Sequence, residues 1–230
     1  MKNYDWIFFD ADDTLFHFDA FSGLQKTFAH FGVVFTQEDY QIYQPINHAL
    51  WIDYQQGLIN AQELQEARFF EWAKRLKISA QTINKTFMMN MVDICTPLNG
   101  ALSLLNKLQG NSKLGIITNG FTELQEARLQ RTGLRHYFDL LVISEEVGIA
   151  KPDPGIFEHA FSFIDAHNRE QILMVGDNPH SDILGGLNAK IHTCWLNVHN
   201  KPAPQGIIPH YEVSSLYELE RLLDSKPMQK

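Results

Sequence analysis

The stretch FFDADDTLF, residues 8–16, places two phenylalanines directly before three aspartates, Asp10, Asp12 and Asp13. The apolar half extends back to Trp6, and a short apolar run without polar alternation is typical of a strand covered on both faces. The acidic half brings together carboxylates that repel one another at so close a spacing. We interpret the stretch as a buried strand whose end carries a functional loop.

Four later runs share this apolar character and alternate with helical patterns. Ala101, Leu104 and Leu108 recur at helical spacing, and Leu216 and Leu219 repeat the pattern near the end of the chain. This alternation predicts an α/β fold with a doubly wound, mainly parallel sheet. Such sheets bind ligands at the carboxyl ends of their strands. The four runs are LGII at 114–117, LLVI at 140–143, ILMV at 172–175 and HTCWL at 192–196.

The connection after the first strand is longer than a parallel sheet requires. The next strand begins about a hundred residues later, whereas a βαβ unit takes about 30 in all. Residues 18–94 contain no convincing strand but hold helical segments, for example at 61–76 and 80–94. We therefore predict a helical cap domain at 18–94, inserted into a catalytic core formed by residues 1–17 and 95–230.

The composition excludes several classes of protein. The 230 residues are 44% apolar, enough for a core, and 19 basic against 27 acidic residues give a net charge of −8. Basic residues do not cluster, so a nucleic acid polymer is not an expected partner. Two cysteines, Cys95 and Cys194, are too few for a disulfide framework or a zinc site. No run approaches the ~18 apolar residues of a membrane span, so we expect a soluble, cytoplasmic protein without a membrane partner.

Polar groups follow four of the predicted strands. Each could be a turn or a helix cap when taken alone. In a parallel sheet, however, all four meet at one edge, and turn chemistry does not demand so many carboxylates, a hydroxyl, an amide and a lysine together. In chain order the groups are Asp10, Asp12, Asp13 and Thr14; Thr118, Asn119 and Gly120; Lys151; and Asp177 with Asp182.

These aspartates predict a metal site. Two unit charges ~4 Å apart repel by about 4 kcal/mol at an effective dielectric constant near 20. A hard divalent cation with oxygen ligands relieves the repulsion, and Mg²⁺ suits a site of one or two carboxylates plus a substrate phosphate.

The four groups together resemble the motifs of the haloacid dehalogenase-like superfamily of phosphohydrolases, and the insertion is similar to the helical cap of that superfamily. The segments that carry the motifs are DADDT at 10–14, TNG at 118–120, AKPD at 150–153 and GDNPHSD at 176–182. The whole chain, including LWIDYQQG, GIITNGFTELQ and RTGLRHYFDLLVISEEVG, resembles the bacterial pyrimidine 5'-nucleotidases, which act on dUMP, dTMP and UMP. The implied activity is Mg²⁺-dependent hydrolysis of a nucleoside 5'-monophosphate.

The resemblance also implies a role for each residue. Asp10 would be the nucleophile that forms an aspartyl-phosphate, and its ordinary pKa of about 4 would keep it ionised at pH 7. Asp12 would protonate the leaving oxygen and later deprotonate the attacking water. Asp10, Asp177 and the backbone carbonyl of Asp12 would hold Mg²⁺, with Mn²⁺ or Co²⁺ as substitutes. Thr118, Asn119 and Lys151 would bind the phosphate. Asp182 would orient Asp177 or a metal-bound water, and Thr14 would fix the loop after the first strand.

Asp13 stands where glycine is common in the superfamily, and we interpret it as a turn residue. Aromatic side chains in or beside the insertion could stack on a base, although most aromatics of a helical domain are core residues. The aromatics in question are Phe16, Phe18, Phe21, Trp51, Tyr54 and Trp72.

The motifs leave alternatives open. The chain could be a phosphatase for another small phosphoester, such as a sugar phosphate, or a mutase. A receiver-like signalling domain also uses an acceptor aspartate and a lysine, but the long insertion is against it. The sequence does not decide the physiological substrate, the preferred metal or the oligomeric state.

Overall fold

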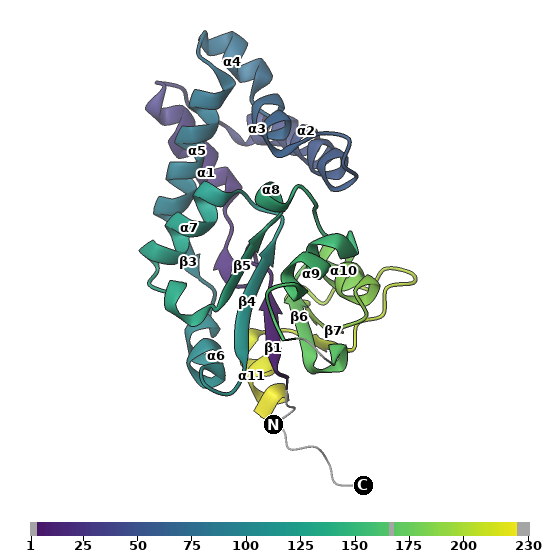
Figure 1. Cartoon of the computed structure of the whole chain (residues 1–230). Helices are drawn as coiled ribbons and strands as arrows, with labels where there is room; N and C mark the ends of the chain where they lie inside the picture. Colours follow the sequence, from purple (N-terminus) through teal and green to yellow (C-terminus); the bar gives the residue numbers. More distant parts are fainter. Residues whose placement is uncertain (1–3, 166–167, 225–230) are drawn as a thin grey trace, which may run out of the picture.

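The computed structural model describes residues 4–165 and 168–224 and is built around a six-stranded sheet (Figure 1). The strand order is β5-β4-β1-β6-β7-β8, and every neighbouring pair is parallel. The predicted α/β fold is therefore confirmed. The strands are β1 (Trp6–Phe9), β4 (Lys113–Thr118), β5 (Leu140–Ile143), β6 (Ile172–Gly176), β7 (His192–Leu196) and β8 (Tyr211–Val213).

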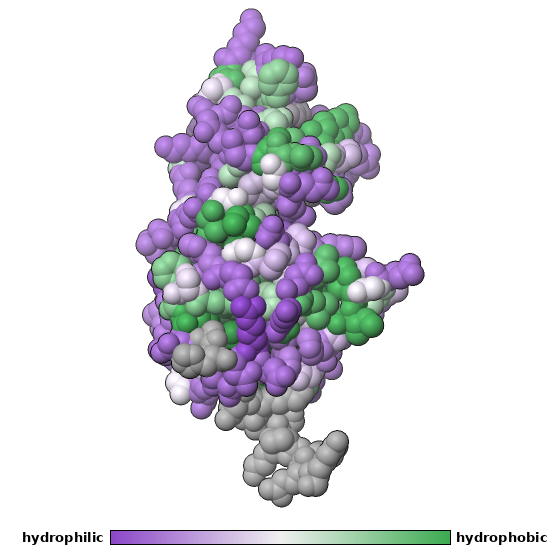
Figure 2. Space-filling model, turned by 45° about the vertical axis from the view of Figure 1, so that its right-hand side comes forward, coloured by the Kyte–Doolittle hydropathy of each residue, from purple (hydrophilic) through white to green (hydrophobic). Residues whose placement is uncertain are grey.

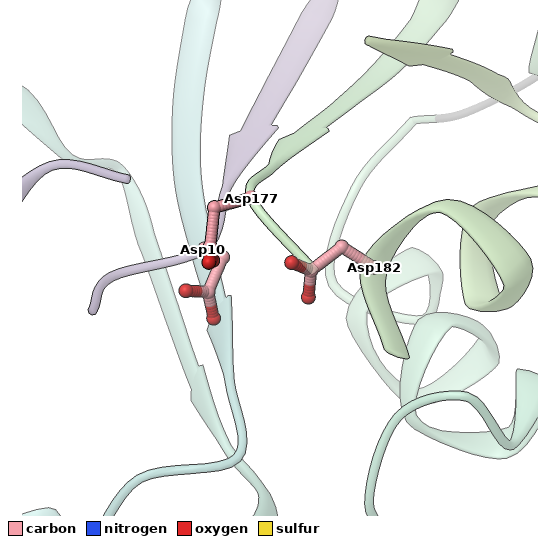
Figure 3. Close-up of side chains that lie close together, drawn as sticks. All are labelled: Asp10, Asp177 and Asp182. Atoms are coloured by element: carbon pink, nitrogen blue, oxygen red, sulfur yellow. The ribbon is translucent and has the colours of Figure 1, made fainter. Parts of the chain in front are cut away.

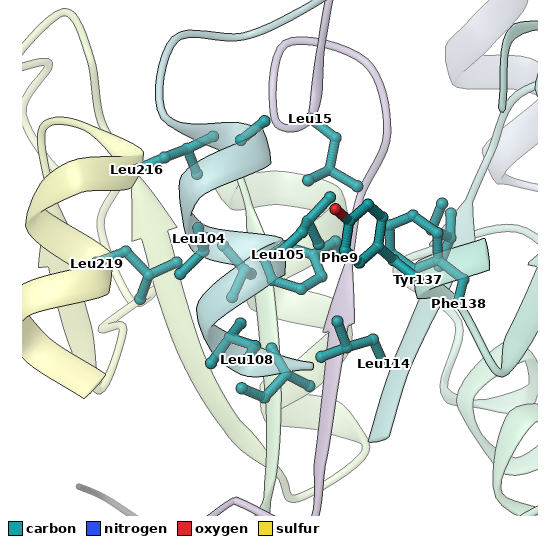
Figure 4. Close-up of a cluster of buried hydrophobic side chains, with 14 of the residues drawn as sticks. Phe9, Leu15, Leu104, Leu105, Leu108, Leu114, Tyr137, Phe138, Leu216 and Leu219 are labelled. Atoms are coloured by element: carbon teal, nitrogen blue, oxygen red, sulfur yellow. The ribbon is translucent and has the colours of Figure 1, made fainter. Parts of the chain in front are cut away.

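Strand β1 lies between β4 and β6 and is buried on both faces of the sheet. Successive side chains of a strand point to opposite faces. Ile7 and Phe9 accordingly join the cluster under α6 (Ala101–Leu108) and α11 (Leu216–Asp224), whereas Phe8 joins the cluster on the other face. Figure 4 shows Phe9 among leucines of these two helices. Burial of each such side chain stabilises the fold by roughly 1.5–3 kcal/mol, and it anchors the residue that follows β1.

Helices and short helical turns connect the strands of the sheet. A π-helical turn, Pro179–Ile183, follows β6 almost directly, and the side chain of Asn178 accepts a hydrogen bond from the amide of His180 at its start. Such turns are often found at functional sites. The remaining connecting elements are α7 (Thr122–Arg131), α8 (Ser144–Val147), α9 (Pro154–Phe161), α10 (Leu184–Asn188) and the 3₁₀ turns Arg135–Tyr137 and Arg169–Gln171.

Five helices lie between residues 18 and 95, and they form the upper part of Figure 1. They supply most of one hydrophobic cluster, which includes Phe28, Leu64 and Phe87 and extends to Phe121, Leu124 and Ala150. The predicted single helical segment at 61–76 is wrong in one respect, because it is broken at Arg68 and Phe69, both of which turn inward and are buried. The helices are α1 (Ala20–His30), α2 (Gln37–Gln55), α3 (Ala61–Ala67), α4 (Phe70–Leu76) and α5 (Ala80–Ile94).

The longest of these helices, α2, has 19 residues and begins with a capping box formed by Thr36 and Asp39. Polar residues recur along it, and an exposed proline, Pro45, lies within it. Across residues 4–165 and 168–224, no helix is both long enough and apolar enough to span a membrane.

The chain leaves and re-enters the sheet region through a small second sheet. Strand β2 (Phe16–His17) pairs antiparallel with β3 (Thr96–Pro97). The sequence predicted neither of these strands nor β8, because runs of two or three residues carry no periodicity. The boundaries at 17/18 and 94/95 lie next to this pair, and the division of the chain into a core and a cap stays a prediction.

Candidate active site

Most of the polar residues predicted at the sheet edge do line one cavity, of about 210 Å³, at the carboxyl ends of β1, β4 and β6. Of the predicted site residues, Thr14 alone is absent from its lining. Trp51 and Gln55 of α2 also line it. The complete lining is Asp10, Asp12, Asp13, Trp51, Gln55, Thr118, Asn119, Gly120, Lys151, Asp177, Asn178, Ser181 and Asp182.

Lys151 is a buried cation with all three ammonium protons in use. Its Nζ donates to Oδ1 of Asp10 at 2.7 Å and to the carbonyl oxygen of Ile117 at 2.6 Å, and it forms an ion pair with Oδ1 of Asp182 at 2.8 Å. Burial lowers the pKa of Lys151, but the two carboxylates outweigh burial and raise it to about 12. Lys151 is therefore a fixed positive charge at the centre of the site.

Asn119 holds the backbone of Lys151 in place. Its Nδ2 donates to the carbonyl oxygen of Lys151 at 2.9 Å, and its Oδ1 accepts from the amide of Lys151 at 2.8 Å. Thr118 Oγ1 accepts from the amide of Gly120 at 3.0 Å and shapes the neighbouring turn. The two bonds of Asn119 join the loop after β4 to the segment after α8, so the segments that carry the predicted phosphate-binding residues are fixed relative to each other.

Three carboxylates gather at this edge of the sheet, as Figure 3 shows, and two of them, Asp10 and Asp182, form ion pairs with Lys151. Asp10 follows β1, Asp177 follows β6 and Asp182 lies in the π-helical turn, and one oxygen from each lies within 4.8 Å of the others. The cluster thus includes Asp182, which the sequence placed only in a supporting role. Gly176 leaves room for it, because a Cβ there would lie 2.2 Å from Oδ2 of Asp182.

The clustering raises the pKa of two of these carboxyl groups. Burial, opposed by Lys151 and reinforced by Asp182, raises the pKa of Asp10 to about 7. Burial together with Asp182 and Asp10 raises the pKa of Asp177 to about 8. The predicted ordinary pKa of Asp10 is therefore wrong for the metal-free protein, because the sequence does not show how deeply the side chain is buried. Carboxylates that repel one another in a buried pocket are the oxygen ligands that a divalent cation prefers, so the donor set fits Mg²⁺.

Asp12 has a partner that the sequence did not reveal. Its Oδ1 accepts a hydrogen bond from Nη1 of Arg128, on α7, in an ion pair. The Arg128 side chain is 2% exposed, its Nε donates to Gln125 Oε1 at 3.0 Å, and its guanidinium lies 4.6 Å from the ring centre of Phe16. Arg128 fixes the direction of the Asp12 carboxylate, which also lines the cavity.

Thr14 and Asp13 shape the loop after β1. The amide of Asp177 donates to Thr14 Oγ1 at 3.1 Å, so this hydroxyl ties the loop after β1 to the loop after β6. Asp13 has a φ of 53°, in the left-handed region, and its Oδ1 accepts from the amide of Phe18 at 3.2 Å. Asparagine and aspartate tolerate this conformation better than most residues, which agrees with a turn role for Asp13.

One of the aromatic candidates lies at the site. Trp51 lines the cavity and packs on Phe121, with ring centres 5.3 Å apart. The others belong to hydrophobic clusters, as the sequence led us to expect of most of them: Phe16 in the cluster under the sheet, and Phe18, Phe21, Tyr54 and Trp72 in the cluster of the inserted helices.

Comparison with known proteins places this geometry in context. A family model described as haloacid dehalogenase-like hydrolase matches residues 4–190. The chain is 57% identical to pyrimidine 5'-nucleotidase YjjG of Escherichia coli (strain K12) over 96% of this chain and 98% of that protein. It is 33% identical to pyrimidine 5'-nucleotidase PynA of Streptococcus pneumoniae over 99% of this chain and 98% of that protein.

A solved structure is similar over almost the whole chain. The HAD-hydrolase YfnB of Bacillus subtilis, in a crystal structure described as bound to magnesium and as revealing interdomain movement, superposes with a TM-score of 0.85. It is 30% identical, and the match covers 97% of this chain and 100% of that one. The family resemblance predicted from the four motifs is confirmed by these matches.

Proposed function

We propose, because the chain belongs to the haloacid dehalogenase-like hydrolases, that it is a pyrimidine 5'-nucleotidase that releases phosphate from nucleoside monophosphates such as dUMP, dTMP and UMP. The observation that carries the proposal is the cluster of Asp10, Asp177 and Asp182 around the buried cation Lys151. The similarity to two pyrimidine 5'-nucleotidases along nearly their full lengths supports the substrate class.

The reaction proceeds in two halves. In the first, a carboxylate oxygen of Asp10 attacks phosphorus, the bond from phosphorus to the 5' oxygen breaks, and Asp12 gives a proton to the leaving oxygen. In the second, Asp12 takes a proton from water, which attacks the aspartyl-phosphate, releases phosphate and restores Asp10. Asp12 ends each cycle in its starting state. Arg128 Nη1 donates to Oδ1 of Asp12, which can accept this bond as an acid or as a carboxylate, so the Asp12 side chain keeps its direction in the cavity through both transfers.

Asp10 and Asp177, with the backbone carbonyl of Asp12, would hold Mg²⁺, and Mn²⁺ or Co²⁺ could take its place. Asp182 lies close enough to the other two carboxylates to be a further ligand of the metal or to orient Asp177. When bound, the cation offsets the repulsion between the carboxylates and the substrate phosphate and serves as a template for in-line attack. The magnesium described in the YfnB structure supports this choice of metal.

The residues of β4 and β5 would hold the phosphate. Thr118 and the amide of Asn119 would donate hydrogen bonds to phosphate oxygens. Lys151 would act mainly through its charge, because its protons are already shared between Asp10, Asp182 and Ile117.

The helices of residues 18–94 would act as a cap over the core formed by 1–17 and 95–230. Trp51 and Gln55 of α2 already line the catalytic cavity. Two contacts join α2 and α3 to α8, the helix that follows β5: Tyr54 OH lies 2.7 Å from Ser144 Oγ, and Gln65 Nε2 donates to Glu145 Oε1 at 2.7 Å. Such a cap excludes water from the reaction.

A phosphate-release panel tests this function. Nucleoside monophosphates and sugar phosphates are compared with and without Mg²⁺, and the Asp10→Asn variant serves as the inactive partner of the wild type. We expect pyrimidine nucleotides to be the best substrates, chelation to stop turnover and Asp10→Asn to remove it while substrate still binds. Faster turnover of sugar phosphates would refute the substrate class, and Mg²⁺-dependent hydrolysis by Asp10→Asn would refute the nucleophile.

The role of Asp12 has a separate test. Asp12→Ala should slow esters with poor leaving groups, such as UMP, far more than activated aryl phosphates, which leave without a proton. Equal losses on both kinds of ester would contradict the role of Asp12 as an acid.

A further inference from the structure

A second cavity, of about 790 Å³, lies beside the catalytic one. Trp51, Gln55 and Asn178 line both, so the two spaces share a boundary. One wall of the second cavity is α2, and Asn178 and His180, at the turn after β6, lie on the side of the sheet. In Figure 2 the surface is hollowed between the helical part above and the sheet part below. The volume lies within the range of small-molecule sites, roughly 300–1,000 Å³.

The wall formed by α2 includes a stripe of aromatic and polar side chains, flanked by Tyr43, Pro45 and Ile52. Its members recur every three or four residues, as residues on one face of a helix do. They are Tyr40, Gln44, Asn47, His48, Trp51 and Gln55. No aspartate, glutamate, lysine or arginine lines this cavity among the described residues, whereas the catalytic cavity is lined by five aspartates and a buried lysine. The second cavity therefore suits an uncharged group.

Several hydrogen-bonding groups of the stripe are unused. The side chains of Gln44, His48 and Gln55 make no hydrogen bond to any residue within the described ranges. Asn47 Oδ1 accepts from Tyr43 OH at 3.3 Å, which leaves its NH₂ group to donate. Trp51 packs on Phe121 and, edge to face, on Tyr54, so its ring is supported from within the protein. A supported aromatic ring beside free amides is well suited to a flat, polar heterocycle.

We propose that this cavity is the nucleoside subsite: the pyrimidine stacks on Trp51, and the amide of Asn47 hydrogen bonds to the polar edge of the base. The proposal rests on the proposed function, because the phosphate must lie at Asp10. The order of residues along α2 gives the direction. Gln55 and Trp51 border the catalytic cavity and lie beside the sugar, while Asn47 lies two turns beyond Gln55, about 12 Å along the helix.

The chemistry of an amide fits a pyrimidine edge. The N3–H and a neighbouring carbonyl of uracil or thymine offer one donor and one acceptor side by side, and the side chain of asparagine or glutamine offers the complement. A sugar phosphate places nothing in this cavity. The subsite therefore distinguishes nucleotides from sugar phosphates by what lies beyond the ribose.

The test compares UMP with ribose 5-phosphate, which has the same phosphoester and no base. Steady-state kinetics with Mg²⁺ are measured for the wild type, Trp51→Ala, Trp51→Phe, Asn47→Ala and Ile42→Ala. Ile42 is 66% exposed and lies opposite Trp51 on α2, so it is the matched control. Thermal unfolding of each variant identifies any loss of folding.

We expect Trp51→Ala to lower kcat/KM for UMP about 10- to 100-fold, the range of base–aromatic stacking. Asn47→Ala should lower it about tenfold, and Trp51→Phe should retain most of the activity. Asn47→Ala should hydrolyse ribose 5-phosphate within about twofold of the wild type, and Ile42→Ala should change neither substrate. Because Trp51 also lines the catalytic cavity, Trp51→Ala should lose some activity on ribose 5-phosphate, but much less than on UMP. If Trp51→Ala and Asn47→Ala weaken both substrates equally, or neither, the subsite is refuted although the nucleotidase function stands. If the wild type does not prefer UMP to ribose 5-phosphate, the proposed function falls and the subsite with it.

Discussion

The ion pair between Arg128 and Asp12 leads to an asymmetric prediction. In Asp12→Ala the guanidinium of Arg128, whose side chain is 2% exposed, loses its carboxylate partner and keeps neutral partners, among them Gln125 and the ring of Phe16. Breaking a buried pair costs about 3–5 kcal/mol when a charge is left uncompensated. The Asp12 side chain is 31% exposed, so water partly replaces it, and we expect a loss at the lower end, about 3 kcal/mol in the free energy of unfolding.

The reverse substitution should cost less. Arg128→Met removes the buried charge, and the remaining Asp12 carboxylate can be hydrated. The loss arises mainly because Gln125 Oε1 no longer has a hydrogen-bond donor, which should lower the free energy of unfolding by about 1–2 kcal/mol. The double variant has no unpaired charge, so its loss should be close to that of Arg128→Met alone. The coupling energy then equals the loss of Asp12→Ala, about 3 kcal/mol.

Urea unfolding of the wild type, the two single variants and the double variant measures these energies. An exposed pair, Lys74 with Glu71, at 3.4 Å and with side chains 61% and 75% exposed, supplies the control cycle, whose coupling should be near zero. The reasoning fails if Arg128→Met destabilises the protein more than Asp12→Ala does. It also fails if the Arg128–Asp12 coupling is no larger than that of the control pair.

Three further predictions concern the cluster and its loop. The pKa values of Asp10 (about 7) and Asp177 (about 8) lie above those of the same groups in the unfolded chain. Between about pH 4 and pH 8 the folded metal-free protein therefore binds more protons than the unfolded chain does. Its melting temperature should therefore fall as the pH rises through this window, and Mg²⁺ should raise it more at pH 8 than at pH 5.5; an equal gain at both would contradict the burial argument. Gly176→Ala should displace Asp182 and weaken Mg²⁺ binding at least tenfold in calorimetry, and unchanged affinity would show that Asp182 is not needed by the metal. Asp13→Asn, which tolerates the same left-handed backbone, should keep kcat within about threefold, and a loss as large as that of Asp10→Asn would make it a catalytic residue.

The sheet could be predicted because strands that are buried on both faces of a parallel sheet consist mainly of apolar residues. WIFF, LLVI and HTCWL are continuous apolar runs, and each became a strand with the expected bounds. The polar groups that follow the predicted strands could be assigned to one edge of the sheet because parallel strands end on the same side. Strand β8 could not be predicted in the same way, since YEV is short and only one of its three side chains is buried.

Arg128 could not be predicted for a different reason. It lies 116 residues from Asp12, in the helix TELQEARLQR, whose composition is mostly polar and reads as a solvent-facing surface. Only the tertiary fold turns Arg128 inward beneath the loop after β1. The same holds for the stripe on α2. Its glutamines, asparagine and histidine have helical spacing, but only the fold places that face of the helix beside the turn after β6.

The charges at the sheet edge give a reason for a divalent cation. When ionised, Asp10, Asp177 and Asp182 carry three negative charges against the single positive charge of Lys151, while Asp12 and Arg128 neutralise each other. The cluster alone therefore carries two excess negative charges and would repel a phosphate dianion. A monovalent cation would leave one of them, whereas a divalent cation brings the cluster to neutrality before the substrate arrives. Lys151 already forms ion pairs with Asp10 and Asp182, so it cannot neutralise the two remaining negative charges. A divalent metal ion must therefore do so.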